Sequence, residues 1–178
     1  MSTISGPLKE TDIEIKQVRF LVTNISHFLR FLRTVADENA CHLILFDAAR
    51  MAGKKHVIAS MSHAMRSFAD GTCISNSLEM EALLYAAGTR QTNIAMQFGI
   101  HGGINKSYLC CVPRIARAWT ALRSQMTEED DDWEVFSPEK EARLAELFGI
   151  TRDEREAAGR ASLQDLIIER VALLEVLK

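Results

Sequence analysis

Several common functional signatures are missing from this sequence of 178 residues. No apolar run approaches the ~20 residues that a membrane-spanning helix needs. The sequence has no phosphate-binding glycine loop of the P-loop or dinucleotide type, and it has no nucleophile elbow. We therefore expect neither a membrane protein nor an enzyme of these nucleotide-binding and hydrolase classes.

Cysteine is scarce, and its spacing is unsuited to metal binding. The four cysteines are Cys41, Cys73, Cys110 and Cys111, and no pair has the two-residue spacing of a zinc knuckle. There is also no secretory signal at the start of the sequence. On a strand, the adjacent Cys110 and Cys111 would point to opposite faces. We expect buried, reduced thiols in a cytoplasmic protein.

The histidines and acids do not suggest a metal site either. His56 and His63 are seven residues apart, which places them ~10.5 Å apart along a helix axis, too far to share one ion. The five consecutive acids of residues 128–132 lack the glycine and the spaced ligands of a calcium loop. They are interpreted as a solvated turn. We expect no metal and no other cofactor.

The sequence does contain enough apolar residues for a folded core. Hydrophobic residues make up 47% and charged residues 25% of the chain, which is typical of a globular domain. The net charge of −3 argues against a globally basic nucleic-acid binder but allows a local basic patch. We expect one domain over residues 1–178, with a loose start (1–12), an α/β core (13–126) and a packed helical extension (137–178).

Apolar spacing predicts strands separated by helices. Alternation over residues 13–22 predicts a strand with a break or bulge near Gln17, where the apolar phase shifts. Residues 42–46 and 107–112 predict two further strands, and residues 133–136 a short edge strand. Three to four strands interleaved with helices indicate an α/β fold, with a single mixed sheet packed with helices.

Polar or basic residues mark the starts of three predicted helices. Asn76 and Glu79 resemble a capping box, and a helix start flanked by lysines favours anions. If these ends converge, they could hold the phosphates and base edges of a short single strand. They could equally be ordinary caps and solvated side chains. The residues concerned are Lys54, Lys55, Asn76, Arg90 and Gln91.

The last predicted helix is apolar on almost every side. One core face needs about half of its apolar residues, so the surplus indicates either deep burial or a partner surface. The candidate partner-binding residues are Leu166, Ile167, Val171 and Leu174.

An ordered set of motifs resembles a known family. The motifs are GKKHVIASMSHAMRSF, CISNSLEMEALLYAAGTRQTNIAMQFGI and the closing IIERVALLEV. Together they resemble the small non-catalytic subunit of the KEOPS complex, the PRPK-binding protein family of archaea and eukaryotes. The resemblance covers residues 40–112 and the final helix well, whereas the first strand and residues 113–136 match only in element order.

This resemblance implies an accessory role in the synthesis of threonylcarbamoyladenosine in tRNA. The family binds the N-terminal lobe of the kinase/ATPase subunit, and in archaea it also grips the single-stranded 3′ CCA end of tRNA. It has no known catalytic residues of its own. Carried over to this sequence, the resemblance places the tRNA contacts at Lys54, Lys55, His56, Ile74, Ser75 and Asn76, with Arg90 and Gln91 beside them.

Three functional interpretations follow. The first is a kinase-binding subunit that recruits tRNA, which requires the eight candidate residues to surround one groove able to accept an unpaired nucleotide tail. The second is a pure protein-interaction activator of the kinase, without RNA binding. The third is a stand-alone enzyme that uses His101 or Cys73, although a lone His-Gly-Gly sequence is more typical of a turn.

Overall fold

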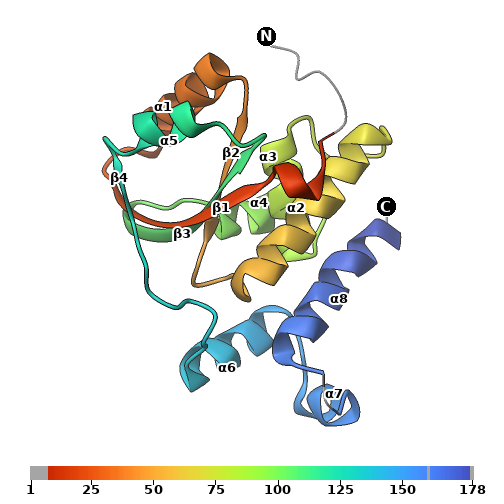
Figure 1. Cartoon of the computed structure of the whole chain (residues 1–178). Helices are drawn as coiled ribbons and strands as arrows, with labels where there is room; N and C mark the ends of the chain where they lie inside the picture. The colour runs from red at the N-terminus through yellow and green to blue at the C-terminus, as the bar shows by residue number, and fades with distance from the viewer. Residues whose placement is uncertain (1–7, 160, 177–178) are drawn as a thin grey trace.

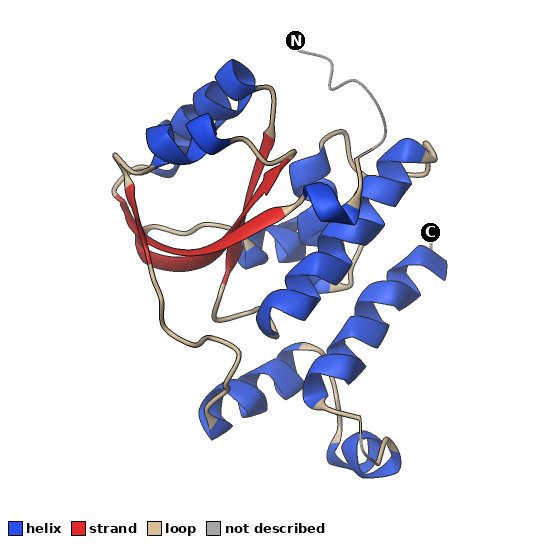
Figure 2. Cartoon of the chain, in the orientation of Figure 1, coloured by secondary structure: helices blue, strands red, loops and turns tan. Residues whose placement is uncertain are grey.

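The computed structural model describes residues 8–159 and 161–176, and the predicted loose start at residues 1–7 lies outside this part of the chain. The elements are η1 (Glu10–Asp12), β1 (Glu14–Val22), α1 (Ile25–Asn39), β2 (His42–Asp47), α2 (Gly53–Ala69), α3 (Leu78–Ala87), α4 (Thr92–Ala95), η2 (Met96–Phe98), β3 (Gly103–Val112), α5 (Ala116–Leu122), β4 (Met126–Glu128), α6 (Pro138–Leu147), α7 (Arg152–Ala157) and α8 (Leu163–Val176). Helices lie on both sides of one sheet (Figures 1 and 2).

The sheet has the strand order β2-β3-β1-β4, and every neighbouring pair is antiparallel. The predicted α/β fold with one sheet is confirmed. The sheet is antiparallel throughout rather than mixed, because β3 lies between β1 and β2 and runs opposite to both. The helices α2 and α3 connect β2 to β3 and return the chain in the reversed direction.

The predicted break at Gln17 is wrong. β1 pairs with β3 in one unbroken register along all nine of its residues. The apolar phase shifts because helices bury both faces of the sheet. Ile13 and Ile15 face the core beneath α2 and α3, whereas Val18 and Phe20 face the core beneath α1 and α5. The phase shift therefore marks a change of buried face and not an inserted residue.

Two helical layers cover the sheet (Figure 1). The helices α1 and α5 cover one face, and α2, α3 and α8 lie on the other side. Cys110 and Cys111 are both fully buried and point into the two different cores, as the alternation along a strand predicts. Burial also raises the pKa of the Cys110 thiol, which keeps this cysteine protonated and unreactive.

The C-terminal helix α8 lies alongside α2 (Figure 1). Near its start, the Gln164 amide donates a hydrogen bond of 2.6 Å to the Ala52 carbonyl. Near its end, the Glu175 carboxylate accepts one of 2.6 Å from the Tyr85 hydroxyl. The helical extension thus contacts the α/β core at both ends of α8, while the single-domain organisation stays a prediction.

The edge strand lies earlier in the chain than predicted. β4 pairs with β1, whereas residues 133–136 form no strand. The Trp133 ring instead packs edge-on against Tyr108, with 5.3 Å between the ring centroids. Phe136 packs against a third core, which lies between α6 and α8. The aromatic side chains of this segment therefore belong to cores rather than to the sheet.

Candidate functional site

The predicted contact residues lie at the two ends of the neighbouring helices α2 and α3 (Figure 1). The start of α2 meets the end of α3, because the His56 ring nitrogen Nε2 lies 3.0 Å from the Ala86 carbonyl oxygen. Since α3 has ten residues, its two ends are about 15 Å apart. The turn at residues 74–76 therefore lies about 15 Å from Arg90, so a nucleotide tail that contacts both must run along α3.

His56 is an interior residue with no exposed surface. Its Nδ1 accepts the Ala52 backbone N–H at 3.1 Å, and its Nε2 donates to the Ala86 carbonyl at 3.0 Å. Burial lowers the pKa of His56 to about 3, although the Ala86 hydrogen bond opposes this shift. His56 is therefore a neutral link between α2 and α3, and its buried side chain is not accessible to RNA.

The lysine pair opens α2 with both side chains exposed, but the backbone at this helix start is already occupied. The Lys54 N–H donates to both carboxylate oxygens of Glu134, at 3.0 and 3.1 Å. A Cβ atom added at Gly53 would collide with the same carboxylate. Glu134 therefore occupies a backbone donor that a phosphate group could otherwise use, whereas the Lys54 and Lys55 side chains stay exposed.

Lys54 also faces an acidic cavity, which separates its role from that of Lys55. The cavity has a volume of about 370 Å³, and its lining includes Lys16, Lys54, residues 128–132 and Glu134. This concentration of carboxylates creates a negative potential that opposes a phosphate near Lys54. Lys55 does not line this cavity, so it is the better placed of the two for RNA.

A buried carboxylate holds the turn before α3. Glu81 is fully buried and accepts the backbone N–H groups of Ile74 and Ser75, at 2.9 and 2.8 Å. Ser77 is the N-cap of α3, because its hydroxyl accepts the N–H three residues on. The predicted capping role of Asn76 is thus wrong, and the Asn76 side chain is exposed. Glu81 is the one acid on an otherwise apolar face of α3. This pattern in the sequence could have predicted its buried contact with the turn.

Arg90 and Gln91 follow the end of α3 and are exposed. The chain can turn there because Gly88 adopts φ +59°, a left-handed conformation that glycine accepts readily. A Cβ atom at Gly88 would approach the Arg170 carbonyl of α8 to 3.5 Å. Arg90 and Gln91 therefore lie near the junction of α3, α4 and α8, at the same end of the helix pair as Lys55.

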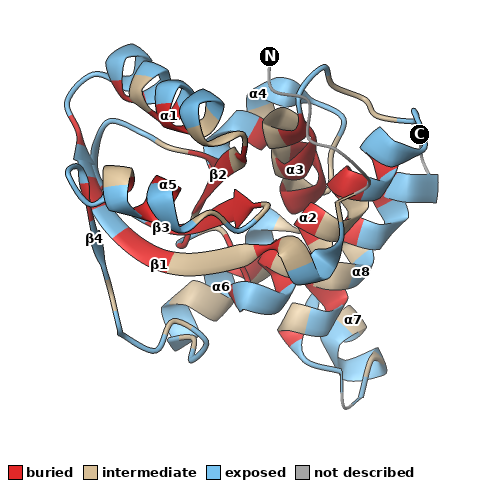
Figure 3. Cartoon of the chain, turned by 45° about the horizontal axis from the view of Figure 1, so that its top comes forward, coloured by how far each residue is buried: buried red, intermediate tan, exposed pale blue. Residues whose placement is uncertain are grey.

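Most of the large apolar residues of α8 are buried, and two of them are exposed (Figure 3). The predicted partner-binding residues are all at most 6% exposed, and they are Leu166, Ile167, Val171 and Leu174. The helix is apolar on several sides because it contributes to two cores, one with α2 and α3 and one with α6. The four residues thus belong to the interior, whereas Leu173 and Val176 are 46% and 80% exposed.

His101, one of the two residues considered for a stand-alone enzyme, lies in a turn. The loop at His101 is a turn closed by Asn105, whose side chain bonds the His101 N–H and carbonyl at 3.0 and 2.8 Å. Within residues 8–159 and 161–176, no three His, Cys, Asp or Glu side chains are grouped to hold a metal ion. In that same part of the chain, none of the helices combines the length and apolar character of a membrane span.

Comparison with known proteins gives one family. A search of curated proteins finds no match. The sequence profile of the family described as Kinase binding protein CGI-121 matches residues 20–175, from β1 into the last turn of α8. This match confirms the resemblance to the PRPK-binding protein family. Because the match spans most of the chain and includes α2, α3 and most of α8, the protein belongs to the kinase-binding accessory family CGI-121.

Proposed function

We propose that this protein is a non-catalytic accessory subunit of the KEOPS complex. It binds the kinase/ATPase subunit and recruits tRNA through the 3′ CCA end for threonylcarbamoyladenosine synthesis in the cytoplasm. The observation that carries the proposal is the match of residues 20–175 to a kinase-binding family. The RNA function draws further support from the exposed Lys55, Arg90 and Gln91 at one end of the α2–α3 pair.

The proposed kinase-docking surface is the outer face of α8. Leu173 and Val176 expose apolar surface there, and the apolar core of a protein interface loses affinity when charges enter it. The double variant Leu173→Asp and Val176→Asp should weaken binding to the kinase subunit about tenfold or more. Because both residues are exposed, the variant should fold normally. Isothermal titration calorimetry with the purified kinase subunit measures the effect.

The matched control uses a second exposed apolar pair. Leu21 and Ile104 lie opposite each other on β1 and β3 and are 58% and 59% exposed. The variant Leu21→Asp and Ile104→Asp introduces the same charges on the sheet, and it should bind the kinase with unchanged affinity. Loss of binding in this control, with full binding in the α8 variant, would place the docking surface on the sheet and refute the α8 proposal.

The proposed RNA contact uses side-chain charge. Lys55 and Arg90 would neutralise phosphates, and the Gln91 amide would bond base edges or ribose hydroxyls. Lys54 contributes less because of its acidic neighbours. Asn76 would contact the RNA only if the single-stranded tail ran along the ~15 Å length of α3. No aromatic side chain belongs to this set, so affinity should depend mainly on charge and fall as salt rises.

Charge reversal at Lys55 and Arg90 tests this contact. The double variant Lys55→Glu and Arg90→Glu should bind tRNA about tenfold or more weakly at low salt, since phosphate contacts become repulsions. Asn76→Ala should have a smaller effect. The control Arg143→Glu and Arg152→Glu makes the same charge change on α6 and α7. Fluorescence anisotropy measures tRNA binding, and circular dichroism checks folding. Unchanged binding in the double variant would favour a pure activator of the kinase.

A further inference from the structure

The layer formed by α1 and α5 is rich in arginine, although the net charge of the chain is −3. Residues 24–36 and 113–127 supply most of this layer, and they contain five arginines, no lysine and no acid. Acids follow only at the end of α1, at Asp37 and Glu38, and in β4. The layer therefore carries a local positive charge on one side of the sheet (Figure 1).

The arginines of α1 point away from the sheet. The buried residues of this helix are Phe28, Leu32 and Val35. A helical repeat of 3.6 residues places Arg30 and Arg33 on the opposite side, where both are exposed (Figure 3). Residues three apart on a helix are neighbours, with about 5–6 Å between their Cβ atoms. The outer side of α1 therefore presents a pair of adjacent guanidinium groups.

The helix α5 contacts α1 and adds a third arginine. The apolar residues of α5 pack inward against the same core as those of α1, whereas Arg117 is exposed. We call Arg30, Arg33 and Arg117 the arginine face. Among the residues that the structure describes, none forms an ion pair with a member of this face. Its charge is therefore available to an anionic partner.

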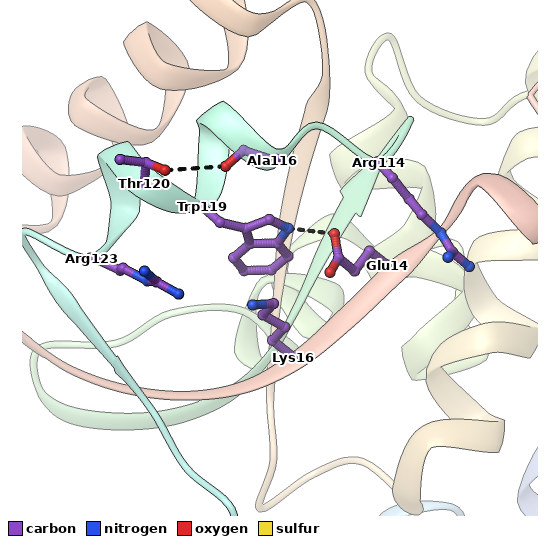
Figure 4. A pocket seen from close by; sticks show the side chains of 7 residues that line it. All are labelled: Glu14, Lys16, Arg114, Ala116, Trp119, Thr120 and Arg123. Atoms are coloured by element: carbon purple, nitrogen blue, oxygen red, sulfur yellow. Dashed lines mark hydrogen bonds between the residues drawn. The ribbon is translucent and has the colours of Figure 1, made fainter.

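The cations of this layer are spread over its surface and not gathered at one point. In the cavity beside α5, Arg114 and Arg123 extend in opposite directions from Trp119 (Figure 4). Lys16 and Arg123 already approach one carboxylate oxygen of Glu128, at 2.8 and 3.7 Å. A single small anion could not meet several free arginines here, whereas a polyanion with regularly spaced charges can do so.

The chemistry of the arginine face suits the backbone of base-paired RNA. Arginine donates paired, planar hydrogen bonds that match phosphate oxygens. Single-stranded RNA is commonly bound by stacking of its bases on aromatic rings, but Phe28, Phe31 and Trp119 of this layer are buried or half-buried. Base-paired RNA is recognised through its shape and its phosphates instead. Carboxylates also match guanidinium groups, so the choice of RNA rests on the proposed tRNA recruitment.

We propose that the arginine face binds the phosphate backbone of a base-paired part of tRNA. The face lies on the opposite side of the sheet from Lys55 and Arg90. It is therefore a second contact, separate from that to the single-stranded 3′ end. Because the two sets of residues share no partners, their contributions to the free energy of binding should add.

The triple variant Arg30→Gln, Arg33→Gln and Arg117→Gln tests this contact. Glutamine is as good a helix former as arginine but carries no charge. The variant should bind tRNA without its CCA end (trimmed tRNA) about tenfold or more weakly than the wild type at low salt. The dependence of log affinity on log salt should also become shallower by roughly two to three, because up to three phosphate contacts are lost. Fluorescence anisotropy measures both quantities, and circular dichroism checks folding.

The matched control removes three exposed arginines from α6 and α7. The variant Arg143→Gln, Arg152→Gln and Arg155→Gln makes the same change of net charge, and it should keep the affinity and the salt dependence of the wild type. Equal weakening in the two triple variants would show an effect of net charge alone and overturn the proposal. Unchanged binding in the arginine-face variant would overturn it as well.

Other anionic partners are compared directly. Ile25 and Leu29 of α1 expose apolar surface, which makes an anionic membrane the main alternative. Phosphatidylserine vesicles or polyglutamate that bind the wild type as tightly as trimmed tRNA would overturn the proposal. An RNA hairpin should bind more tightly than oligouridylate of equal charge, and the reverse order would overturn the assignment to base-paired RNA.

This contact can be separated from the 3′-end contact. The arginine-face variant should weaken intact and trimmed tRNA by the same factor, whereas Lys55→Glu with Arg90→Glu should weaken only the intact tRNA. Equal affinity of the wild type for the two tRNAs would refute the 3′-end contact and leave the arginine face standing. Trimmed tRNA that binds the arginine-face variant as tightly as the wild type would refute the arginine face alone.

Discussion

Lowering the pH from about 7.5 to about 4.5 should remove about 3 kcal/mol from the free energy of unfolding through His56 alone. In the unfolded chain this histidine has its ordinary pKa near 6.5, whereas burial lowers the pKa to about 3 in the folded protein. Below pH ~6.5 the unfolded chain therefore binds a proton that the folded protein rejects. Stability contributed by His56 is complete above this pH and is lost as the pH falls toward 3.

Urea unfolding at the two pH values measures this loss, and two variants isolate it. His56→Gln keeps polar groups near Ala52 and Ala86 but cannot titrate, so it should be less stable at pH ~7.5 by about 1–3 kcal/mol. It should also lose about 3 kcal/mol less than the wild type on acidification. His101→Gln, which replaces an exposed histidine, should behave like the wild type. An equal acid loss in His56→Gln and the wild type would contradict the buried, neutral state of His56.

The sequence predicted the helices that surround the candidate site. The spacing of apolar residues in α2 and α3 is local information, and Gly88 ends α3 with the positive φ that a C-terminal glycine supplies. The opposite orientations of Cys110 and Cys111 also follow from strand geometry alone. These features depend on neighbouring residues, so one sequence suffices to predict them.

The remaining features depend on residues far apart in the sequence. Glu134 is 80 residues from Lys54, whose backbone N–H it accepts, and no local pattern indicates this contact. His56 follows two exposed lysines, yet its side chain points inward to a carbonyl of another helix. The surplus of apolar residues on α8 reflects deep burial, because a helix that joins two cores is apolar on more than one side.

The one-groove arrangement stays a prediction, and the length of α3 limits it. The sequence shows that polar groups mark both ends of a helix, but the length of that helix separates them. About 15 Å lies between the Ile74–Asn76 turn and Arg90. The proposed contact therefore contracts to Lys55, Arg90 and Gln91, which share one end of the helix pair.

Removal of the terminal CCA from tRNA tests the central functional proposal most directly. We expect the wild-type protein to bind trimmed tRNA about tenfold or more weakly than intact tRNA at the same low salt, because contacts from Lys55, Arg90 and Gln91 to the single-stranded tail are lost. The variant Lys55→Glu and Arg90→Glu should bind both tRNAs with similar weak affinity. The four dissociation constants form a double-mutant cycle that links the tail to these side chains.

Anisotropy titrations of the two tRNAs against the wild type and the variant give these constants. A coupling free energy of about 1.4 kcal/mol or more between the CCA tail and the Lys55–Arg90 pair is the result that the account predicts. Equal affinity of the wild-type protein for intact and trimmed tRNA would contradict recruitment through the 3′ end.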